Sequence, residues 1–100
     1  MIAAALLAGC GSIREHRGIA SEDPAEKIPA IKQAGAAKDK NAVRQLIKEL
    51  NHDDPAVRFY SIQALERITG ETLDYHFYAD EDQRKPAITR WNEWLGKHRH

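Results

Sequence analysis

Apolar side chains recur at the spacing of an α-helix in the middle of this chain. Large aliphatic residues fall at positions i, i+3, i+4 and i+7, and they are Val43, Leu46, Ile47 and Leu50. Residues at this spacing lie on one side of a helix, because an α-helix has about 3.6 residues per turn. The pattern predicts an amphipathic helix over residues 42–50, capped by Asn41, with these four side chains in a core and Arg44, Lys48 and Glu49 outside it.

A second stripe of the same kind follows a short polar break. Asp54 and Pro55 form a helix-start signal, since aspartate caps free backbone N–H groups and proline suits the first helical position. Gly70 suits the residue after a helix, so the helix is predicted over residues 55–69. Its stripe contains Val57, Ser61, Ala64, Leu65 and Ile68, with Tyr60 and Ile62 on either side. An apolar surface this wide predicts that other parts of the protein pack against this helix from more than one direction.

The same start signal occurs 31 residues earlier, at Asp23 and Pro24. It predicts a helix over residues 24–37, with a weaker stripe that contains Ile28, Ile31 and Gly35. Pro29 lies near the first turn, where its missing N–H group has little effect. The distance between the two signals is close to the length of a helical-hairpin repeat.

Residues 41–70 resemble a HEAT-like repeat of the bilin-lyase type. The resemblance depends on Asp53-Asp54-Pro55-Ala56-Val57-Arg58, on Ser61, Ala64-Leu65 and Ile68, and on the aliphatic stripe of the preceding helix. It implies an all-α fold, a short array of antiparallel helical hairpins with about four helices wound into an α-α superhelix. It also implies that Asp54 caps its helix and that Arg58 reaches toward a neighbouring turn.

The last predicted helix covers residues 86–97 and begins at Pro86, after a long connection over residues 71–85. Its apolar stripe is Ile88, Trp91, Trp94 and Leu95, and this end is similar to the C-terminal ends of some small bacterial HEAT-repeat proteins. Two indoles, each burying about 150–250 Å², are expected to cap the open end of the array. Four residues of the connection are expected to join the same cluster: Leu73, Tyr75, Phe77 and Tyr78.

The first ten residues resemble a bacterial lipoprotein signal. An uncharged apolar run ends in Leu7-Ala8-Gly9-Cys10, which is similar to a lipobox, where a peptidase cuts before an acylated cysteine. The resemblance implies lipidation of Cys10 by more than one acyl chain, which is sufficient for stable membrane attachment. The run itself is too short to span a bilayer, because a spanning helix needs about 20 residues.

A second interpretation of this segment stays open. Signal peptides normally begin with Lys or Arg, whereas only the amino terminus is charged here. The segment can also be an alanine-rich helix with a buried cysteine. Under the lipoprotein interpretation, residues 1–9 are the signal segment, residues 10–22 are a flexible tether, and residues 23–100 are the HEAT-like helical domain with its tryptophan cap.

Charge and cysteine content argue against several classes of protein. Lys and Arg number 15, as do Asp and Glu, so the formal net charge is zero. A nucleic-acid-binding protein is expected to have a basic surface, and no nucleic-acid partner is predicted. Because Cys10 is the single cysteine, an intrachain disulfide and a cysteine zinc site are excluded.

No motif indicates catalysis or metal binding. Asp80-Glu81-Asp82 lacks the order of a calcium loop, and its charge is expected to lie at the N-terminus of the last helix. The five histidines show no ligand spacing on a helix and no His-Glu dyad: His16, His52, His76, His98 and His100. No catalytic residue, cofactor, metal ion or small-molecule substrate is predicted.

One exposed aromatic residue suggests a contact surface. Phe59 lies opposite Val57 on the helix, so it either meets a partner protein or packs against the C-terminal tryptophans, and we prefer the packing interpretation.

These observations predict a module for protein–protein interaction or scaffolding, without enzyme activity. Its lipid holds it to a membrane of the bacterial cell envelope, on a periplasmic or outer face. The first alternative is a soluble accessory or fragment domain of a larger HEAT assembly. The second is a subunit of a bilin-lyase-like enzyme for cofactor attachment.

Overall fold

The part of the chain that the structure describes is helical. The computed structural model describes residues 18–98, which contain four α-helices, a short 3-10 helix and no strand. The helices are α2 (Pro24–Ala37), η1 (Lys40–Ala42), α3 (Val43–Glu49), α4 (Pro55–Thr69) and α5 (Glu81–Lys97). The predicted all-α class is confirmed for these residues.

Helices α2 and α4 begin and end at the residues that the sequence marks. Asp23 and Asp54 each accept a hydrogen bond from the backbone two residues later, at 3.0 and 2.8 Å. Gly70 follows α4 with a φ of 81°, in the left-handed region where glycine has no steric penalty. The predicted bounds of α2 and α4 and the cap role of Asp54 are therefore confirmed. The prediction that Asn41 caps the helix between them was wrong: Asp39 caps the short 3-10 helix before α3, and its carboxylate accepts a hydrogen bond from the backbone N–H of Asn41 at 3.0 Å.

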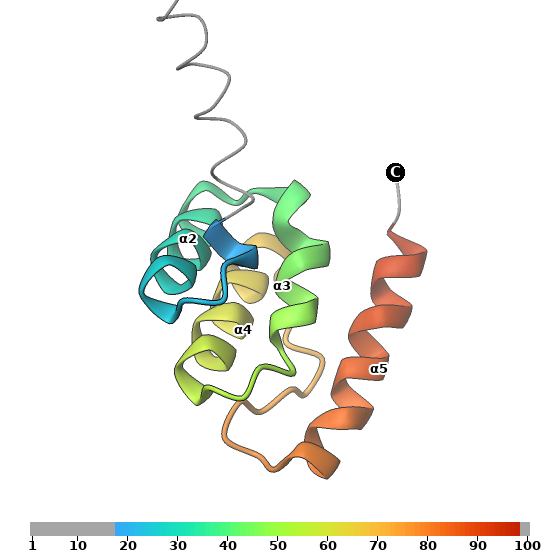
Figure 1. Ribbon diagram of the computed structural model, residues 1–100. Coiled ribbons are helices and arrows are strands. Elements are labelled where there is room, and N and C mark those ends of the chain that lie inside the picture. The colour runs from blue at the N-terminus through green and yellow to red at the C-terminus, as the bar shows by residue number, and fades with distance from the viewer. Residues whose placement is uncertain (1–17, 99–100) are drawn as a thin grey trace, which may run out of the picture.

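Helix α3 lies in the middle of the arrangement, with α4 and α2 on one side of it and α5 on the other (Figure 1). Helices α2 and α4 run in the same direction, because residues further along α2 contact residues further along α4. Lys32 lies over Tyr60, and one turn further a Cβ atom at Gly35 would lie 3.0 Å from Ala64. The absence of a side chain at Gly35 thus permits the close approach of the two helices.

The core is formed by the stripes that the sequence predicts. The four aliphatic residues of α3 are buried, as are Val57, Ala64 and Leu65 of α4 and Ile31 of α2. Trp91 is fully buried and joins the same core from α5. The apolar spacing thus identifies the interior, although Ile28 and Ile68 are only partly buried.

One charged residue that was expected outside the core lies inside it. Glu49 is 6% exposed, because its carboxylate meets the ammonium group of Lys27 at 2.6 Å. The prediction that Glu49 lies off the buried side of α3 was wrong.

Helix α5 begins earlier than predicted. It starts at Glu81, with Asp80 as the N-cap, and Pro86 lies inside it rather than at its first position. The carboxylate of Asp80 accepts a hydrogen bond from the backbone of Gln83 at 3.0 Å, and Glu81 and Asp82 add negative charge to the first turn, as expected. These N-terminal interactions explain why helix precedes Pro86, although proline removes one backbone hydrogen bond.

Residues 18–20 form a helical turn that packs on the domain. Ile19 is 2% exposed, and its carbonyl accepts a hydrogen bond from Lys27 at 2.6 Å. The sequence assigned these residues to a flexible tether that ends at residue 22. The packed domain therefore includes Ile19, upstream of the predicted boundary.

Candidate functional site

The one site residue that the sequence predicts, Cys10, lies outside the described residues. The structure therefore gives no geometry for the predicted lipid attachment. The candidate site that it does describe is a groove between α2 and α4, together with the aromatic side chains beside it.

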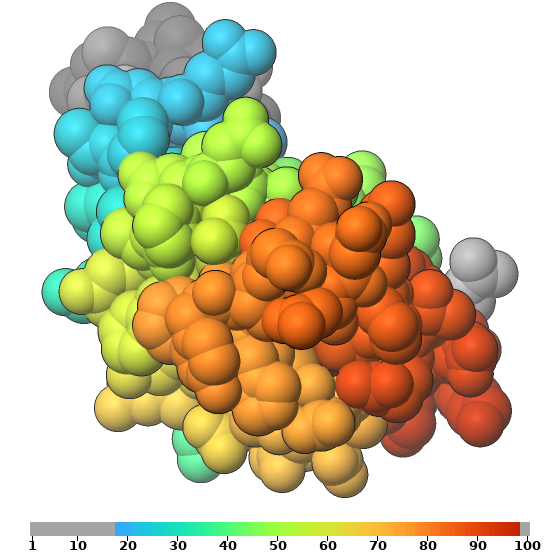
Figure 2. All heavy atoms as spheres, turned by 90° about the horizontal axis from the view of Figure 1, so that it is seen from below, coloured from blue at the N-terminus to red at the C-terminus, as the bar shows by residue number. Residues whose placement is uncertain are grey.

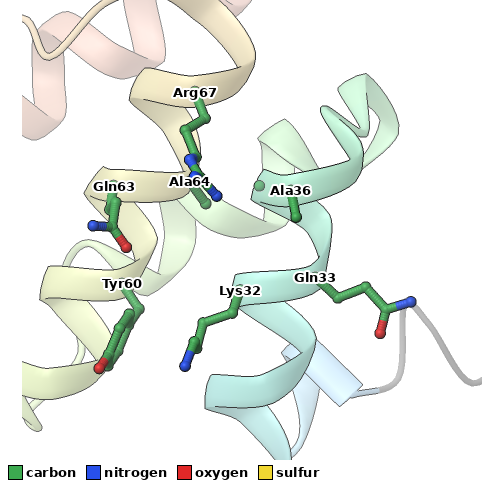
Figure 3. A pocket seen from close by; sticks show the side chains of 8 residues that line it. Lys32, Gln33, Ala36, Tyr60, Gln63, Ala64 and Arg67 are labelled. Carbon is green, nitrogen blue, oxygen red and sulfur yellow. The ribbon is translucent and has the colours of Figure 1, made fainter.

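The groove has a volume of about 340 Å³. Helix α2 lines it with Lys32, Gln33, Gly35 and Ala36, and α4 lines it with Tyr60, Gln63, Ala64 and Arg67. Lys32 and Tyr60 point toward one another across it (Figure 3). Helices α2 and α4 approach one another closely within it, where the small residues Gly35 and Ala64 meet.

Two cationic side chains border the groove. The Lys32 ammonium group lies 5.3 Å from the centre of the Tyr60 ring, within cation–π distance. The aliphatic part of Arg67 passes about 3.7 Å from the Cβ position of Gly35, so this side chain lies across the groove. Both residues are exposed, and neither forms an ion pair with another residue of the described range.

A row of aromatic rings continues from the groove. Adjacent rings meet edge to face at centroid distances of 5.0 to 5.4 Å, in the order Tyr60, Phe59, Phe77 and Tyr78. We call these four residues the aromatic row. Phe59 is 36% exposed and Tyr78 is 70% exposed, so the row ends at the surface. Single exposed apolar residues are common, but contiguous ones often mark a binding surface.

The position of the aromatic row corrects two expectations. Phe59 packs on Phe77 and Tyr60, and none of its aromatic contacts in the described range is with a tryptophan. Tyr78 was expected in the core, and it is instead mostly exposed. Both differences arise because Phe77 and Tyr78 lie next to α4, in the connection that spreads over the surface between α4 and α5 (Figure 2).

Two buried arginines hold this connection in place. The Arg58 guanidinium donates hydrogen bonds to the carbonyls of Phe77, His52 and Asp53 at 2.9, 2.6 and 3.0 Å. Arg84 donates to the carbonyl of Ala79 at 2.7 Å. The reach of Arg58 toward neighbouring turns confirms the role that the resemblance implied, and it fixes the backbone that carries Phe77.

Tyr75 is the buried centre of the same connection. Its hydroxyl donates a hydrogen bond to the carbonyl of Leu50 at 2.5 Å. Burial raises the pKa of Tyr75 to about 12, and the charges of Arg58 and Arg84 oppose part of this increase. The hydroxyl therefore stays protonated under ordinary conditions and acts as a structural donor.

The C-terminal tryptophans pack as a pair. The rings of Trp91 and Trp94 meet at 5.7 Å, and the indole N–H of Trp91 donates to the carbonyl of Thr72 at 3.1 Å. Trp94 is only partly buried and stacks on the ring of His98 at 4.0 Å. Trp91 thus closes the core, while Trp94 and its neighbour Leu95 leave part of the apolar side of α5 accessible.

Within residues 18–98, no three His, Cys, Asp or Glu side chains are arranged to hold a metal ion. None of the helices described here is long and apolar enough to cross a membrane.

Comparisons with protein-family models, with curated proteins and with solved structures found no match for this chain. The resemblance to HEAT-like repeats therefore stays a prediction.

Part of the site was missed from sequence alone. Tyr60 was assigned to the border of a core stripe, and Lys32 and Arg67 were given no role. The common start signals of α2 and α4 do not give this register: Lys32 lies eight residues after Pro24, whereas Tyr60 lies five residues after Pro55. The two side chains meet across this offset of three residues, so their contact follows from how the two helices pack.

Proposed function

We propose that this protein is a membrane-tethered module for protein–protein interaction, built of helical hairpins and without catalytic activity. The observation that carries this proposal is the continuous surface of the groove and the aromatic row. It combines a hollow of about 340 Å³, two exposed cations and two exposed aromatic side chains. Interfaces are enriched in aromatic residues and arginine, and their centres are depleted of other charged residues.

We further propose that the helices are units of a HEAT-like array. Helices α2 and α4 share a start signal, run in the same direction and pack side by side, as equivalent helices of successive repeats would. Helix α3 also contacts α5, but these two helices run in opposite directions (Figure 1), so the array proposal rests on α2 and α4. In such an array the groove lies between two equivalent helices, a position where stacked hairpins commonly form a binding surface.

The membrane tether is proposed from the sequence. Leu7-Ala8-Gly9-Cys10 supports cleavage before Cys10 and attachment of a lipid to it, which would place the domain on a membrane of the bacterial cell envelope. In this proposal the tether ends where Ile19 is held by Lys27, so that fewer than ten residues separate the lipid from the folded domain.

A second candidate is an accessory domain of a larger helical assembly. The observation that favours it is the partly accessible apolar side of α5, which includes Ile88, Trp94 and Leu95. A further hairpin stacked on α5 would cover these side chains.

The tether is tested by fractionation and mass spectrometry of the native chain. We expect the protein in membrane fractions with acyl chains on Cys10, and we expect Cys10→Ala to appear in the soluble fraction. A native chain that is soluble and unmodified at Cys10 would contradict the tether.

The interaction surface is tested by photo-crosslinking in cells. A photoreactive phenylalanine derivative replaces Tyr78 in the aromatic row or, as a control, Glu93, which is exposed on α5. We expect a discrete crosslinked protein from position 78 that is absent from position 93. The same products from both positions, or none from position 78, would contradict the proposed surface.

A further inference from the structure

We propose that the groove binds an extended, acidic segment of a partner protein. Lys32 and Arg67 would hold its carboxylates, and the aromatic row would hold an apolar side chain that follows them. This inference rests on the proposed interaction function and names the chemistry of the partner.

Charge complementarity is the first argument for an acidic occupant. Within the described range, the three ion pairs are Lys27–Glu49, His76–Asp74 and Lys85–Asp82, so Lys32 and Arg67 have no carboxylate partner there. The remaining groove residues are small, amide-bearing or aromatic. The lining therefore has two positive charges and no negative charge, although the whole chain is neutral.

The two cations lie at different points along the groove. The Lys32 ammonium group lies over Tyr60, and the Arg67 side chain passes Gly35, which is three residues after Lys32. Tyr60 and Arg67 are seven residues apart on α4, which is about 10 Å of helix. An extended segment that runs along the groove covers this length with about three residues, so acidic residues about two to four positions apart would meet the two cations one after the other.

The aromatic row continues the same surface beyond Tyr60. Its rings are held edge to face, and Arg58 fixes the carbonyl of Phe77. A rigid apolar surface next to two cations can bind a segment in which acidic residues are followed by an aromatic or aliphatic residue. The amide groups of Gln33 and Gln63 supply donors and acceptors for the backbone of such a segment.

The same features argue against a nucleic acid in the groove. Nucleic acids carry closely spaced phosphates, and proteins that bind them use many cations. Here the lining has only two, and Glu66 precedes Arg67 on α4 with its side chain exposed. The aromatic rings meet one another edge to face, which leaves less ring surface for stacking on bases.

The test uses fluorescence anisotropy on the full chain in detergent, with two short synthetic peptides. One peptide alternates glutamate with phenylalanine, and the matched peptide has glutamine in place of glutamate. We expect saturable binding of the glutamate peptide, and roughly 10-fold weaker binding of the glutamine peptide, because two charge contacts are lost. A higher ionic strength should weaken only the first interaction.

Two double variants with the same change in net charge assign the binding to the groove. Lys32→Glu with Arg67→Glu should weaken binding of the glutamate peptide by roughly 10-fold or more. Arg44→Glu with Lys48→Glu, at exposed positions of α3, should leave it unchanged. Circular dichroism of both variants should show the native helix content, because all four side chains are exposed and none forms a hydrogen bond within the described range.

Several results would overturn the inference. They are an absence of saturable binding, equal effects of the two double variants, or equal affinity for the two peptides. Tighter Lys32- and Arg67-dependent binding of polyuridylate or of phosphatidylglycerol vesicles would overturn it as well, since the groove would then prefer phosphates. The proposed function has a separate readout, because a crosslink from position 78 would persist if the groove took a segment without acidic residues.

Discussion

The buried ion pair between Lys27 and Glu49 offers the sharpest test of the packing. Its two side chains are 5% and 8% exposed, and its atoms meet at 2.6 Å. Lys27 also donates to the carbonyl of Ile19 at 2.6 Å, and Glu49 accepts from the amide of Gln45 at 2.8 Å. The pair thus connects the first turn of the domain to α2 and α3.

Removal of one partner of this ion pair should lower the free energy of unfolding strongly. Glu49→Ala leaves the Lys27 ammonium group buried, with only the carbonyl of Ile19 as a partner. Loss of one member of a buried pair costs about 3–5 kcal/mol. A domain of about 80 residues has a free energy of unfolding of about 4–12 kcal/mol, so this substitution should remove a large part of the stability.

Replacement of both partners should have a much smaller effect. In the double variant Lys27→Met with Glu49→Leu neither charge of this pair is left buried without its partner, and such replacements are often neutral or stabilising. We therefore expect each single variant to be strongly destabilised and the double variant to lie within about 1 kcal/mol of the native chain.

Urea unfolding followed by tryptophan fluorescence and circular dichroism measures these differences. The exposed pair of Lys85 and Asp82, at 3.6 Å, provides the control, and Lys85→Ala should cost no more than about 0.5 kcal/mol. The reasoning is refuted if Glu49→Ala costs as little as this control, or if the two single effects simply add in the double variant.

Three further predictions concern Tyr75, Gly35 and Asp54. The pKa of Tyr75 is raised from 10.0 to about 12, so the folded state holds its proton more tightly; this stabilisation is complete below pH 10 and should be lost as pH rises from 10 to 12. The free energy of unfolding from urea titrations should fall over this range by about 2–3 kcal/mol more for the native chain than for Tyr75→Phe, and an equal fall in both would contradict the burial of the hydroxyl. Gly35→Val should destabilise the domain by about 1–3 kcal/mol, since its Cβ atom would meet Ala64 at 3.0 Å. In the control variant Gly96→Val the new Cβ atom meets nothing within 4 Å, so the free energy of unfolding should change by only about a few tenths of a kcal/mol, as expected at an exposed helix position. Equal shifts of the melting temperature in the two variants would count against the contact between Gly35 and Ala64. Asp54→Ala should cost about 1 kcal/mol through the lost N-cap, while Asp54→Asn should retain most of the stability, and an unchanged denaturation midpoint in the alanine variant would show that the cap has no effect.

The main helices could be predicted because their signals are local. The Asp-Pro starts at Pro24 and Pro55, the glycine at position 70 and the aliphatic stripe of α3 each depend on neighbouring residues alone. The start of α5 could not be predicted in this way. Pro86 is a strong start signal, but the cap at Asp80 and the acidic first turn allow a helix to form before it.

The features that were missed depend on contacts between distant residues. Lys27 and Glu49 are 22 residues apart, and each is charged, so neither stands out as a core residue until α2 and α3 are placed together. Ile19 was missed for the same reason, because the Lys27 side chain that holds its carbonyl lies eight residues later in the chain. The partner of Phe59 is Phe77, and a connection without regular structure gives no periodicity from which to place that ring.

The groove has a similar origin. Its lining residues share no motif, and they become a site only because α2 and α4 pack in parallel. The interaction surface therefore depends on the direction and register of these two helices.

The most direct test of the account is an NMR measurement of proton contacts between α2 and α4. We expect strong nuclear Overhauser effects from the Hα atoms of Gly35 to the methyl group of Ala64, and from the side chain of Lys32 to the ring of Tyr60. Contacts of Gly35 with the first turn of α4, near Pro55, would show antiparallel helices and would contradict the groove and everything inferred from it.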